Sequence, residues 1–484
     1  MVLVTVQMGP ATEPVHNRIR ELAELNRAWQ SDRPELLIAA GRRRAGKSYL
    51  LSHFLQDRPG FYYQATRSTG REQLRTLGQI AAQRFPAAGL EFTNGFTDWD
   101  SFFRFLVRQA DGKPFLLILD EVPYLLDAVR GFGSQLQRFW DHELRGTLIK
   151  VVLSGSYVSG MRRLTDNDQP LHGRKTGTLA FAPFSYRDAA RFVPGWSAKD
   201  KLVAYAAFGG LPGQLALLNP TQSVAENVAQ HMLNPAGRLS DEAEHLFDAF
   251  LKEAGVHYSI VRAIASGEHK WSKITNRVGK DSASLSRPLD WLQDMDVVAR
   301  VIPITDTPPG NPKKTLYRIT DPYLQFWHHF VAMIRASGAD DLMEPKVLWE
   351  RFVAPRLSDY MGPVFESVCR SFVGHSQHPT LPFRPVRVGE WWSDDSMEQV
   401  DVIALGAEGE VLIGECKWGA FGLDDLATLE RRRDLVVKKL SGVNRIFLAA
   451  FSGQPITDET VAARVASGAL LHFSHDALYD GESV

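Results

Sequence analysis

The sequence predicts an α/β protein with three parts: a parallel sheet with helices on both faces, a helical middle, and a second α/β unit at the C-terminal end. Short apolar runs of the kind found in buried parallel strands occur within 36–40, 113–126 and 148–161. Helical patterns at 71–85 and 99–110 alternate with these runs, which indicates a helix-covered parallel sheet. A β-hairpin pattern further along the chain indicates the C-terminal unit.

Length and composition indicate a soluble protein of several domains. A chain of 484 residues is too long for one hydrophobic core. Its 55 lysines and arginines balance 56 aspartates and glutamates, so any surface for nucleic acid must be local. The two cysteines, Cys369 and Cys416, favour a reducing compartment over a disulfide framework or structural zinc. No apolar run reaches the ~18 residues of a membrane span, and the N-terminus lacks a basic leader, so we expect a cytoplasmic protein without a membrane partner.

The strongest single motif follows the first apolar run. Residues 41–48, GRRRAGKS, match the phosphate-loop pattern G-x-x-x-x-G-K-[ST] between a strand pattern and a helix pattern. Two glycines let backbone amides point at phosphate oxygens, Lys47 is expected to reach the β- and γ-phosphates of ATP, and Ser48 is expected to bind Mg²⁺. The residues expected to contact nucleotide are Gly41, Arg42, Arg43, Arg44, Ala45, Gly46, Lys47, Ser48 and Tyr49.

The next two apolar runs end in residues that suit phosphate chemistry. LILDE, within 113–126, ends in Asp120, which is placed to hold Mg²⁺, and Glu121, which can act as general base toward a water. The run within 148–161 ends in small polar residues. Ser154 or Ser156 could sense the γ-phosphate, but serines after strands are also common turn formers, and the two interpretations stay open.

Six motifs in this order resemble the archaeal-type ATPases, of the STAND/AAA+ branch of the P-loop NTPases. They are NRIRELAEL (17–25), GRRRAGKS, LDEVPYL, LSGSYVSGM, GRKTGTLAFAPFSYRDA (173–189) and GGLPGQL (209–215). The resemblance implies an ATPase whose Asn17 and Arg18 lie near the nucleotide edge. It also implies that Arg174 reaches the phosphates and that Pro212 contacts the adenine side. Without the resemblance, Arg174 is a basic residue after a loop and Pro212 belongs to a turn.

The middle of the chain predicts a winged helix, which the resembled family also carries. Residues 257–320 read as three short helices followed by a hairpin. Ser282 to Ser286 begin the third helix, the one that reads DNA in many such folds. Nearby basic residues favour DNA, while interspersed aspartates break up the positive face. DNA reading and a lid or docking role both stay open.

The C-terminal hairpin brings acidic residues together. Strands at 399–405 and 411–417 are joined by a five-residue loop, so Leu405 pairs with Val411 and Asp401 falls opposite Glu415. Opposed carboxylates about 5 Å apart destabilise a hairpin unless a cation lies between them. A loop shorter by one residue would put the two acids on opposite faces.

These acids, with a nearby lysine, resemble the site of PD-(D/E)XK nucleases. Asp401, Glu415 and the Cys416 carbonyl offer oxygen ligands for Mg²⁺ or Mn²⁺, and Lys417 on the same face could stabilise charge at a scissile phosphate. Glu366, on a preceding helix, completes the catalytic set. The chain departs from this pattern at one position, because Val400 and not a proline precedes Asp401. The alternative is a decayed or structural site, in which these residues form ordinary ion pairs.

Together these features predict an ATP-dependent switch coupled to a metal-dependent domain that binds or cleaves nucleic acid. The alternative is a signalling ATPase whose C-terminal domain binds nucleic acid or a protein without cleavage. The expected partners are ATP and DNA, and a homo-oligomer stays open. The predicted parts are a P-loop ATPase domain at 1–190, a helical lid at 191–256, a winged helix at 257–335 and a restriction-endonuclease-like α/β domain at 336–484.

Overall fold

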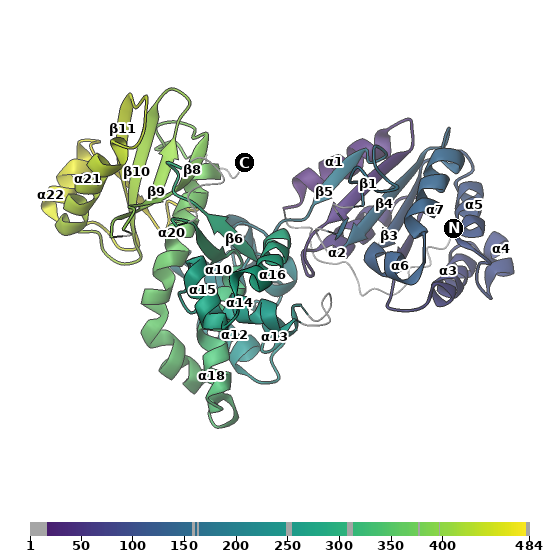
Figure 1. Ribbon diagram of the computed structural model, residues 1–484, viewed down its shortest axis with the longest axis horizontal. Helices are drawn as coiled ribbons and strands as arrows, with labels where there is room; N and C mark the ends of the chain where they lie inside the picture. The colour runs from purple at the N-terminus through teal and green to yellow at the C-terminus, as the bar shows by residue number, and fades with distance from the viewer. Residues whose placement is uncertain are drawn as a thin grey trace. The chain divides into compact units, whose positions relative to one another are not determined.

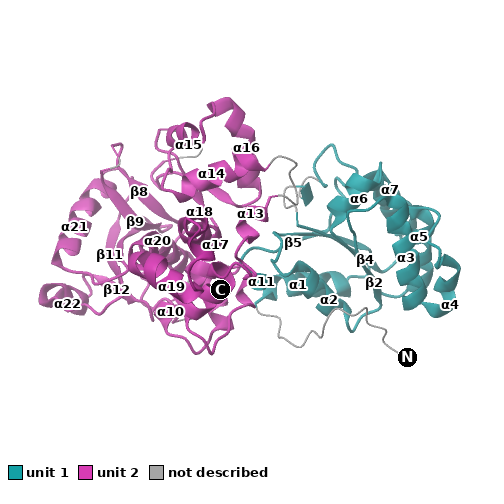
Figure 2. Ribbon diagram, turned by 90° about the horizontal axis from the view of Figure 1, so that it is seen from below, with its two compact units in different colours: residues 1–183, 211–213 teal, residues 184–210, 214–484 magenta. Residues whose placement is uncertain are grey.

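The protein forms two compact units in the computed structural model (Figure 2). Unit 1 comprises Met1–Pro183 and Leu211–Gly213, and unit 2 comprises Phe184–Gly210 and Gln214–Val484. The structure describes residues 17–156, 160–161, 164–247, 254–306, 313–375, 378–395 and 397–480. The N-terminal segment that was examined for a leader, and residues 157–159 of the third apolar run, lie outside these ranges. Within the described ranges, every helix is too short or too polar to cross a membrane.

Unit 1 is built on a five-stranded parallel sheet (Figure 1). Its strands are β1 (Glu35–Ala40), β2 (Gly60–Gln64), β3 (Phe115–Asp120), β4 (Ile149–Gly155) and β5 (Gly177–Ala180). The strand order is β2-β3-β4-β1-β5, with parallel pairing throughout. The predicted strands and the predicted parallel sheet are confirmed. Because β4 lies between β1 and β3, its carboxyl end reaches the space between the phosphate loop and the two acids that follow β3.

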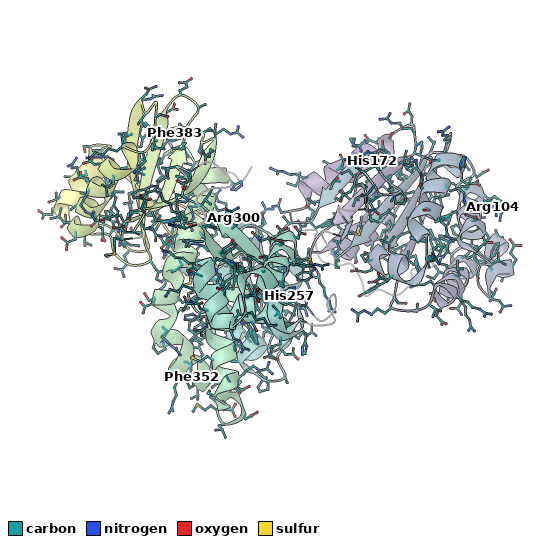
Figure 3. All side chains as sticks on the ribbon, viewed as in Figure 1. Arg104, His172, His257, Arg300, Phe352 and Phe383 are labelled. Atoms are coloured by element: carbon teal, nitrogen blue, oxygen red, sulfur yellow. The ribbon has the colours of Figure 1, made fainter. Side chains whose placement is uncertain are left out.

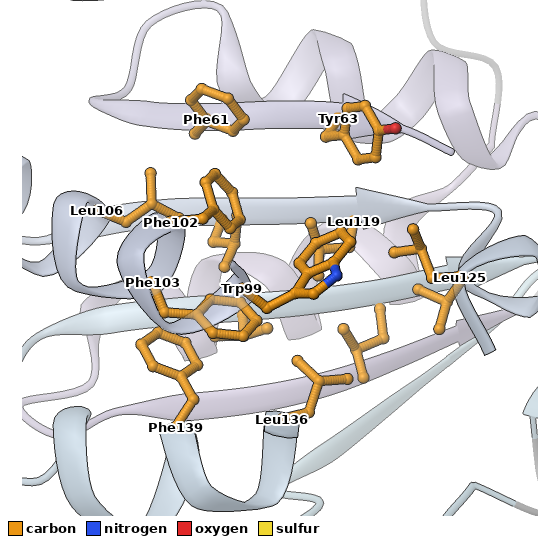
Figure 4. Packing of buried hydrophobic residues seen from close by; sticks show 14 of the residues in the cluster. Phe61, Tyr63, Trp99, Phe102, Phe103, Leu106, Leu119, Leu125, Leu136 and Phe139 are labelled. Atoms are coloured by element: carbon orange, nitrogen blue, oxygen red, sulfur yellow. The ribbon is translucent and has the colours of Figure 1, made fainter. Parts of the chain in front are cut away.

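Helices cover both faces of this sheet. They are α1 (Ile19–Gln30), α2 (Lys47–Leu55), α3 (Gly70–Arg84), α4 (Pro86–Gly89), α5 (Trp99–Ala110), α6 (Val122–Ala128) and α7 (Phe132–Arg138). An aromatic core on one face packs α5 against the strands (Figure 4). In it, the ring of Phe102 meets Phe61 edge-on at 5.5 Å, and Phe103 stacks on Phe139 at 4.2 Å. A separate apolar cluster on the other face holds α1 and α2 and so fixes the phosphate loop between β1 and α2.

Unit 2 contains short helices before and after the segment 255–319. These are α9 (Tyr186–Ala189), α10 (Ala198–Phe208), α11 (Pro212–Leu215, which starts in the unit 1 segment), α12 (Val224–Val228), α13 (Glu242–His245), α17 (Pro322–Phe326), α18 (Ala332–Ala336) and α19 (Pro345–Leu348). The aromatic stretch around α17 is buried, with Phe326, Trp327 and Phe330 all in the interior. Trp327 donates its indole N–H to the Ser240 carbonyl at 2.8 Å, so its one polar atom is satisfied.

The winged-helix pattern is also present in unit 2. Its elements are α14 (Gly255–Ala265), α15 (Trp271–Val278), α16 (Ser282–Asp294) and the antiparallel strands β6 (Val298–Val301) and β7 (Leu316–Ile319). An isolated antiparallel bridge joins Lys270 to Leu316 of β7. His257, labelled in Figure 3, packs its ring against Trp291 at 5.1 Å and joins α14 to α16. The predicted order of three helices and a hairpin is therefore confirmed.

A mixed five-stranded sheet forms the C-terminal part of unit 2. Its elements are α20 (Leu357–His375), β8 (Arg387–Trp392), β9 (Gln399–Leu405), β10 (Glu410–Lys417), α21 (Leu423–Val437), β11 (Arg445–Ser452), α22 (Glu459–Ala466) and β12 (Leu471–Ser474). The strand order is β12-β11-β10-β9-β8. β8, β9 and β10 pair antiparallel, and β10, β11 and β12 pair parallel. Helix α20 packs against β8, β9 and β10, and α21 packs against β9, β10 and β11.

The β6–β7 hairpin is joined to the edge strand β8 of this sheet. The Ile304 amide donates to the Glu390 carbonyl at 2.9 Å, and the Trp392 indole donates to the Lys314 carbonyl at 3.1 Å. Arg318 of β7 also donates to the Glu390 carboxylate at 2.8 Å. The hairpin and its connecting loop therefore contact β8 within unit 2, and the choice between DNA reading and a lid or docking role stays open. The finer division of the chain into four domains stays a prediction.

A buried histidine beside the C-terminal sheet should make unit 2 sensitive to acid. His475 is 6% exposed, its ring lies 4.4 Å from Trp418 and 5.1 Å from Phe365, and its Nε2 is buried without a hydrogen-bond partner among the described residues. Burial lowers its pKa to about 4, helped by Lys199 and opposed by Asp476. The folded pKa lies below the unfolded pKa of about 6.5, so the unfolded chain binds the extra proton.

We expect this histidine to contribute stability that is complete above pH 6.5 and lost as the pH falls toward 4, by about 3 kcal/mol. Urea unfolding of the parent and of His475→Phe at a series of pH values between 4 and 8 measures the difference. The variant should lose less stability on acidification than the parent. The matched control is His375→Phe, since His375 is exposed. Equal acid sensitivity of the parent and His475→Phe would contradict the prediction.

Candidate functional site

The phosphate loop has a backbone that only small or strained residues can adopt. Gly46 has a φ of 84°, and Arg44 has a φ of 66°, an uncommon value for a residue with a side chain. A Cβ on Gly41 would lie 2.5 Å from the Cβ of Phe181, so a side chain has no room there. Both motif glycines are therefore required by geometry.

The ammonium of Lys47 lies inside the loop. Lys47 is 4% exposed, and its Nζ donates to the carbonyls of Gly41 at 2.7 Å and Arg42 at 3.2 Å, and to the Ser156 hydroxyl at 2.9 Å. Burial lowers its pKa, against the opposing effect of Glu121 and Asp120. Two loop carbonyls and the Ser156 hydroxyl thus hold the ammonium inside the loop.

The structure brings Ser48 and Asp120 together, as the sequence predicts. The Ser48 hydroxyl donates to Asp120 Oδ2 at 2.5 Å, and the Glu121 amide donates to Oδ1 at 2.9 Å. A third donor was not anticipated from sequence: the Tyr62 hydroxyl lies 2.7 Å from Oδ2. The adjacent pair β2–β3 brings Tyr62 there, and a sequence does not disclose which strands are neighbours.

Glu121 is held by the end of β4. Its backbone has a φ of 53°, in the left-handed region, where it forms the N-cap of α6. Its carboxylate accepts from the Ser156 hydroxyl at 2.5 Å and from the Ser156 amide at 3.2 Å. Ser156 therefore lies between Lys47 and Glu121, whereas the hydroxyl of Ser154 is buried without a partner among the described residues. Of the two serines left open by the sequence, Ser156 is the one joined to the site.

Arg18 lies against the loop, near the position that the resemblance implies. Its guanidinium donates to the carbonyls of Ala45 at 2.8 Å and Ala182 at 3.0 Å, and lies over the ring of Phe181 at 5.3 Å. Arg18 therefore ties the phosphate loop to the segment after β5.

Pro212 also lies beside the loop. A Cβ on Gly46 would be 3.8 Å from Pro212 Cγ, and the Gly213 amide donates to the Arg44 carbonyl at 3.1 Å. This contact is the reason why Leu211–Gly213 belongs to unit 1 although the chain on either side belongs to unit 2.

Arg174 is engaged elsewhere. Its guanidinium forms a fork with Asp141, with distances of 2.9 and 2.8 Å, and donates to the carbonyls of Pro170 and His172. It would have to leave this pair to reach a phosphate, so its role stays a prediction. Among the other loop residues, Arg42 is buried, while Arg43 and Tyr49 are exposed.

A second cluster of charged residues lies on the C-terminal sheet. The hairpin has the predicted register, with Leu405 opposite Val411 and Val402 opposite Gly414, which carries Asp401 toward Glu415. Asp401 is 7% exposed and Glu415 4%. Burial raises the pKa of Asp401 well above its usual range, and the charges of Glu366 and Glu415 raise it further. We call Glu366, Asp401, Glu415 and Lys417 the carboxylate cluster.

Cations hold the acids of the carboxylate cluster. Arg370 donates to the Asp401 carbonyl at 2.7 Å and lies 3.7 Å from the Glu366 carboxylate. Glu415 is paired with Arg432 of α21 at 2.8 Å and with Lys417 at 3.3 Å. In addition, the Asp401 carboxylate accepts the Cys416 amide at 2.9 Å, and Lys417 lies 3.1 Å from Asp425.

Within the described ranges, no group of three or more acids, histidines or cysteines is spaced to hold a metal ion. The carboxylates of Glu366 and Glu415 contact arginine or lysine instead, and that of Asp401 accepts the Cys416 amide. The contacts of Arg370 and Arg432 with these acids were not predicted from the sequence. Arginines on α20 and α21, near acids on the facing sheet, are the signal that could have indicated this network.

Comparisons with known proteins are consistent with a phosphate-binding loop in unit 1. Residues 15–218 match the family described as an ATPase domain predominantly from Archaea. These residues are thus similar to an ATPase domain of the archaeal type. Residues 327–429 match a second family, described as archaeal and bacterial proteins of unknown function. This second match overlaps the carboxylate cluster and assigns it no activity.

One curated protein and two solved structures illustrate the similarity. An uncharacterized protein of Methanocaldococcus jannaschii is 28% identical over 435 residues, which cover 88% of this chain and 92% of the relative. A Walker-type ATPase of Pyrococcus abyssi shares 21% identity, with a TM-score of 0.49, over 66% of this chain and 99% of that chain. The Aeropyrum pernix ORC2 protein, in a structure of its ADPNP–ADP complexes, shares 15% identity, with a TM-score of 0.42, over 68% of this chain and 98% of that chain.

Proposed function

We propose that the ATPase domain hydrolyses ATP and acts as a switch for unit 2. The observation that carries this proposal is the buried chain of contacts from Lys47 through Ser156 to Glu121, beside the Ser48–Asp120 pair. These residues are the phosphate-binding cation, the base and the two metal-site residues that phosphoryl transfer needs. The GGLPGQL turn against the loop supports the finer assignment to the STAND branch.

The residues fit Mg²⁺ as the metal partner of ATP. Ser48 and Asp120 offer oxygen donors 2.5 Å apart in the interior, the donor type that Mg²⁺ prefers. When bound, Mg²⁺ would neutralise charge on the β- and γ-phosphates. Lys47 would turn from the loop carbonyls to the phosphate oxygens, and Glu121 would accept the proton of the attacking water.

ATP binding by the parent protein and by Lys47→Ala tests the proposal. Loss of a buried charge-assisted hydrogen bond, worth about 1.5–3 kcal/mol, should weaken ATP binding about 10–100-fold. Isothermal titration with ATP and Mg²⁺ measures the affinity, and Lys113→Ala is the matched control because Lys113 is exposed. Parental affinity in Lys47→Ala would refute the assignment of the loop.

For unit 2 we propose a metal-dependent domain that binds or cleaves nucleic acid. The chain order α20, β8, β9, β10, α21, β11, with acids on α20, β9 and β10, supports a restriction-endonuclease-like domain. Buried, mutually repelling carboxylates are costly to keep, and they are common where a cation has to bind. In this proposal Asp401 and Glu415 hold Mg²⁺ or Mn²⁺, Glu366 assists and Lys417 faces the phosphate.

Binding without cleavage is the second candidate. The contact of Arg432 with Glu415 favours it, because that arginine neutralises a carboxylate that a metal would need. DNA is the expected partner in both cases. Exposed basic residues on α15, on α16 and between these helices support it: Lys273, Arg277, Lys280 and Arg287.

A further inference from the structure

We propose that Tyr62 is a positioning residue that fixes the Asp120 carboxylate for metal binding. This inference rests on the proposed ATPase function and names a residue that neither the phosphate-loop motif nor the acidic pair includes. The contact that carries it is the hydrogen bond from the Tyr62 hydroxyl to Asp120 Oδ2, at 2.7 Å.

Strand geometry places Tyr62 on the face where the metal would bind. Tyr62 pairs with Ile118 in the β2–β3 register, two residues before Asp120. Residues two apart in a strand share a face, so Ile118 and Asp120 point to the same side of the sheet. That side also carries α2, whose Ser48 reaches the same carboxylate oxygen. Tyr62 packs at the border of the apolar cluster there, so its ring is held beneath the acid.

The hydroxyl of Tyr62 donates to the Asp120 carboxylate. Burial raises the pKa of this hydroxyl, and the charge and hydrogen bond of Asp120 raise it further. Asp120 in turn is wholly buried and accepts three hydrogen bonds: those of Ser48 and Tyr62 on Oδ2 and that of the Glu121 amide on Oδ1. The carboxylate is thus fixed at both oxygens.

Metal binding would affect the three hydrogen-bond donors to Asp120 differently. A Ser48 oxygen bound to the ion can still donate its hydrogen to Asp120, but its position is then set by the ion as well. The Tyr62 hydroxyl and the Glu121 amide have no such second duty and can keep the carboxylate plane in place. Hydrogen bonds of this kind to metal-site carboxylates are worth about 10–100-fold in metal affinity. Without the hydroxyl, the acid can rotate away from the position that the ion requires.

Tyr62→Phe tests the inference, since it removes the hydroxyl and keeps the ring. In one experiment, Mg²⁺ is titrated into the protein with a fluorescent ATP analogue at a fixed low concentration. In a second experiment, binding of the analogue is measured in chelator without Mg²⁺. We expect the Mg²⁺ concentration for half-maximal tight binding to rise about 10-fold or more, with binding in chelator unchanged. The matched control is Tyr63→Phe. Tyr63 neighbours Tyr62 on β2 but donates to buried Gln73 on the opposite face, so its loss should leave the Mg²⁺ dependence at the parental value.

Several outcomes would overturn the inference. An unchanged Mg²⁺ dependence in Tyr62→Phe shows that the hydroxyl does not position Asp120. A loss of binding by the same factor in chelator shows a general structural role instead. In the Asp120→Ala variant the Tyr62 hydroxyl has no carboxylate to hold, so adding Tyr62→Phe should not shift the Mg²⁺ dependence further. An additive shift in the double variant would also contradict the inference. A parent protein that binds no nucleotide refutes the proposed function itself, which separates the two failures.

Discussion

Replacing Glu121 by glutamine is expected to slow ATP turnover by about 10²–10⁴-fold while nucleotide binding stays at the parental level. Glutamine has nearly the same shape. Its one side-chain oxygen can accept from the Ser156 amide and its NH₂ can donate to the Ser156 hydroxyl oxygen, in place of the parental contacts at 3.2 and 2.5 Å. It cannot accept the proton of the attacking water. The Asp120 carboxylate and Lys47 are untouched, so the groups expected to bind metal and phosphate remain.

Phosphate release under saturating ATP and Mg²⁺ measures turnover, and titration calorimetry measures binding. The matched control is Glu91→Gln, because Glu91 is an exposed acid of unit 1. Lys47→Ala gives the opposite pattern, since it should lose binding first. Parental turnover in Glu121→Gln would show that another group serves as the base.

The sheet and the loop of unit 1 could be predicted because their signals are local. A wholly apolar run of about six residues with a glycine-rich turn and a helix pattern after it leaves few alternatives. The β9–β10 hairpin of unit 2 could also be predicted from a local signal. Loop length alone decides whether Asp401 and Glu415 share a face, and the observed pairing of Leu405 with Val411 agrees with the five-residue loop.

The contacts around the acids could not be predicted because they depend on which elements are neighbours. Tyr62 reaches Asp120 only because β2 lies beside β3, and Ser156 reaches Glu121 only because β4 lies between β3 and β1. The partner of Arg174 could not be predicted from the sequence either. A motif resemblance implies a phosphate contact, but the fold offers Asp141 at 2.8 Å, and a bidentate carboxylate satisfies a guanidinium well.

The second large effect concerns unit 2. If the carboxylate cluster supports cleavage, Asp401→Asn should lower metal-dependent nucleic-acid cleavage by about 10²-fold or more, because it removes the charge of a metal ligand. Asparagine still offers a side-chain oxygen to the Cys416 amide, which donates to Asp401 at 2.9 Å, so the hairpin should keep its shape. Basal ATP turnover should stay at the parental level, since the ATP site lies in a different compact unit.

The decisive measurement compares parent and Asp401→Asn on single- and double-stranded DNA and RNA, with Mg²⁺ or Mn²⁺ and with chelator. Glu398→Gln is the matched control: Glu398 pairs with Arg431 and Arg432 but is not one of the proposed ligands. Cleavage that is equal in parent and Asp401→Asn would place the activity in another site or another protein. Cleavage by neither, with nucleic acid still bound, would favour the second candidate. In that case the pairing of Arg432 with Glu415 is the stable arrangement of the cluster, and its acids organise a binding surface rather than a metal ion.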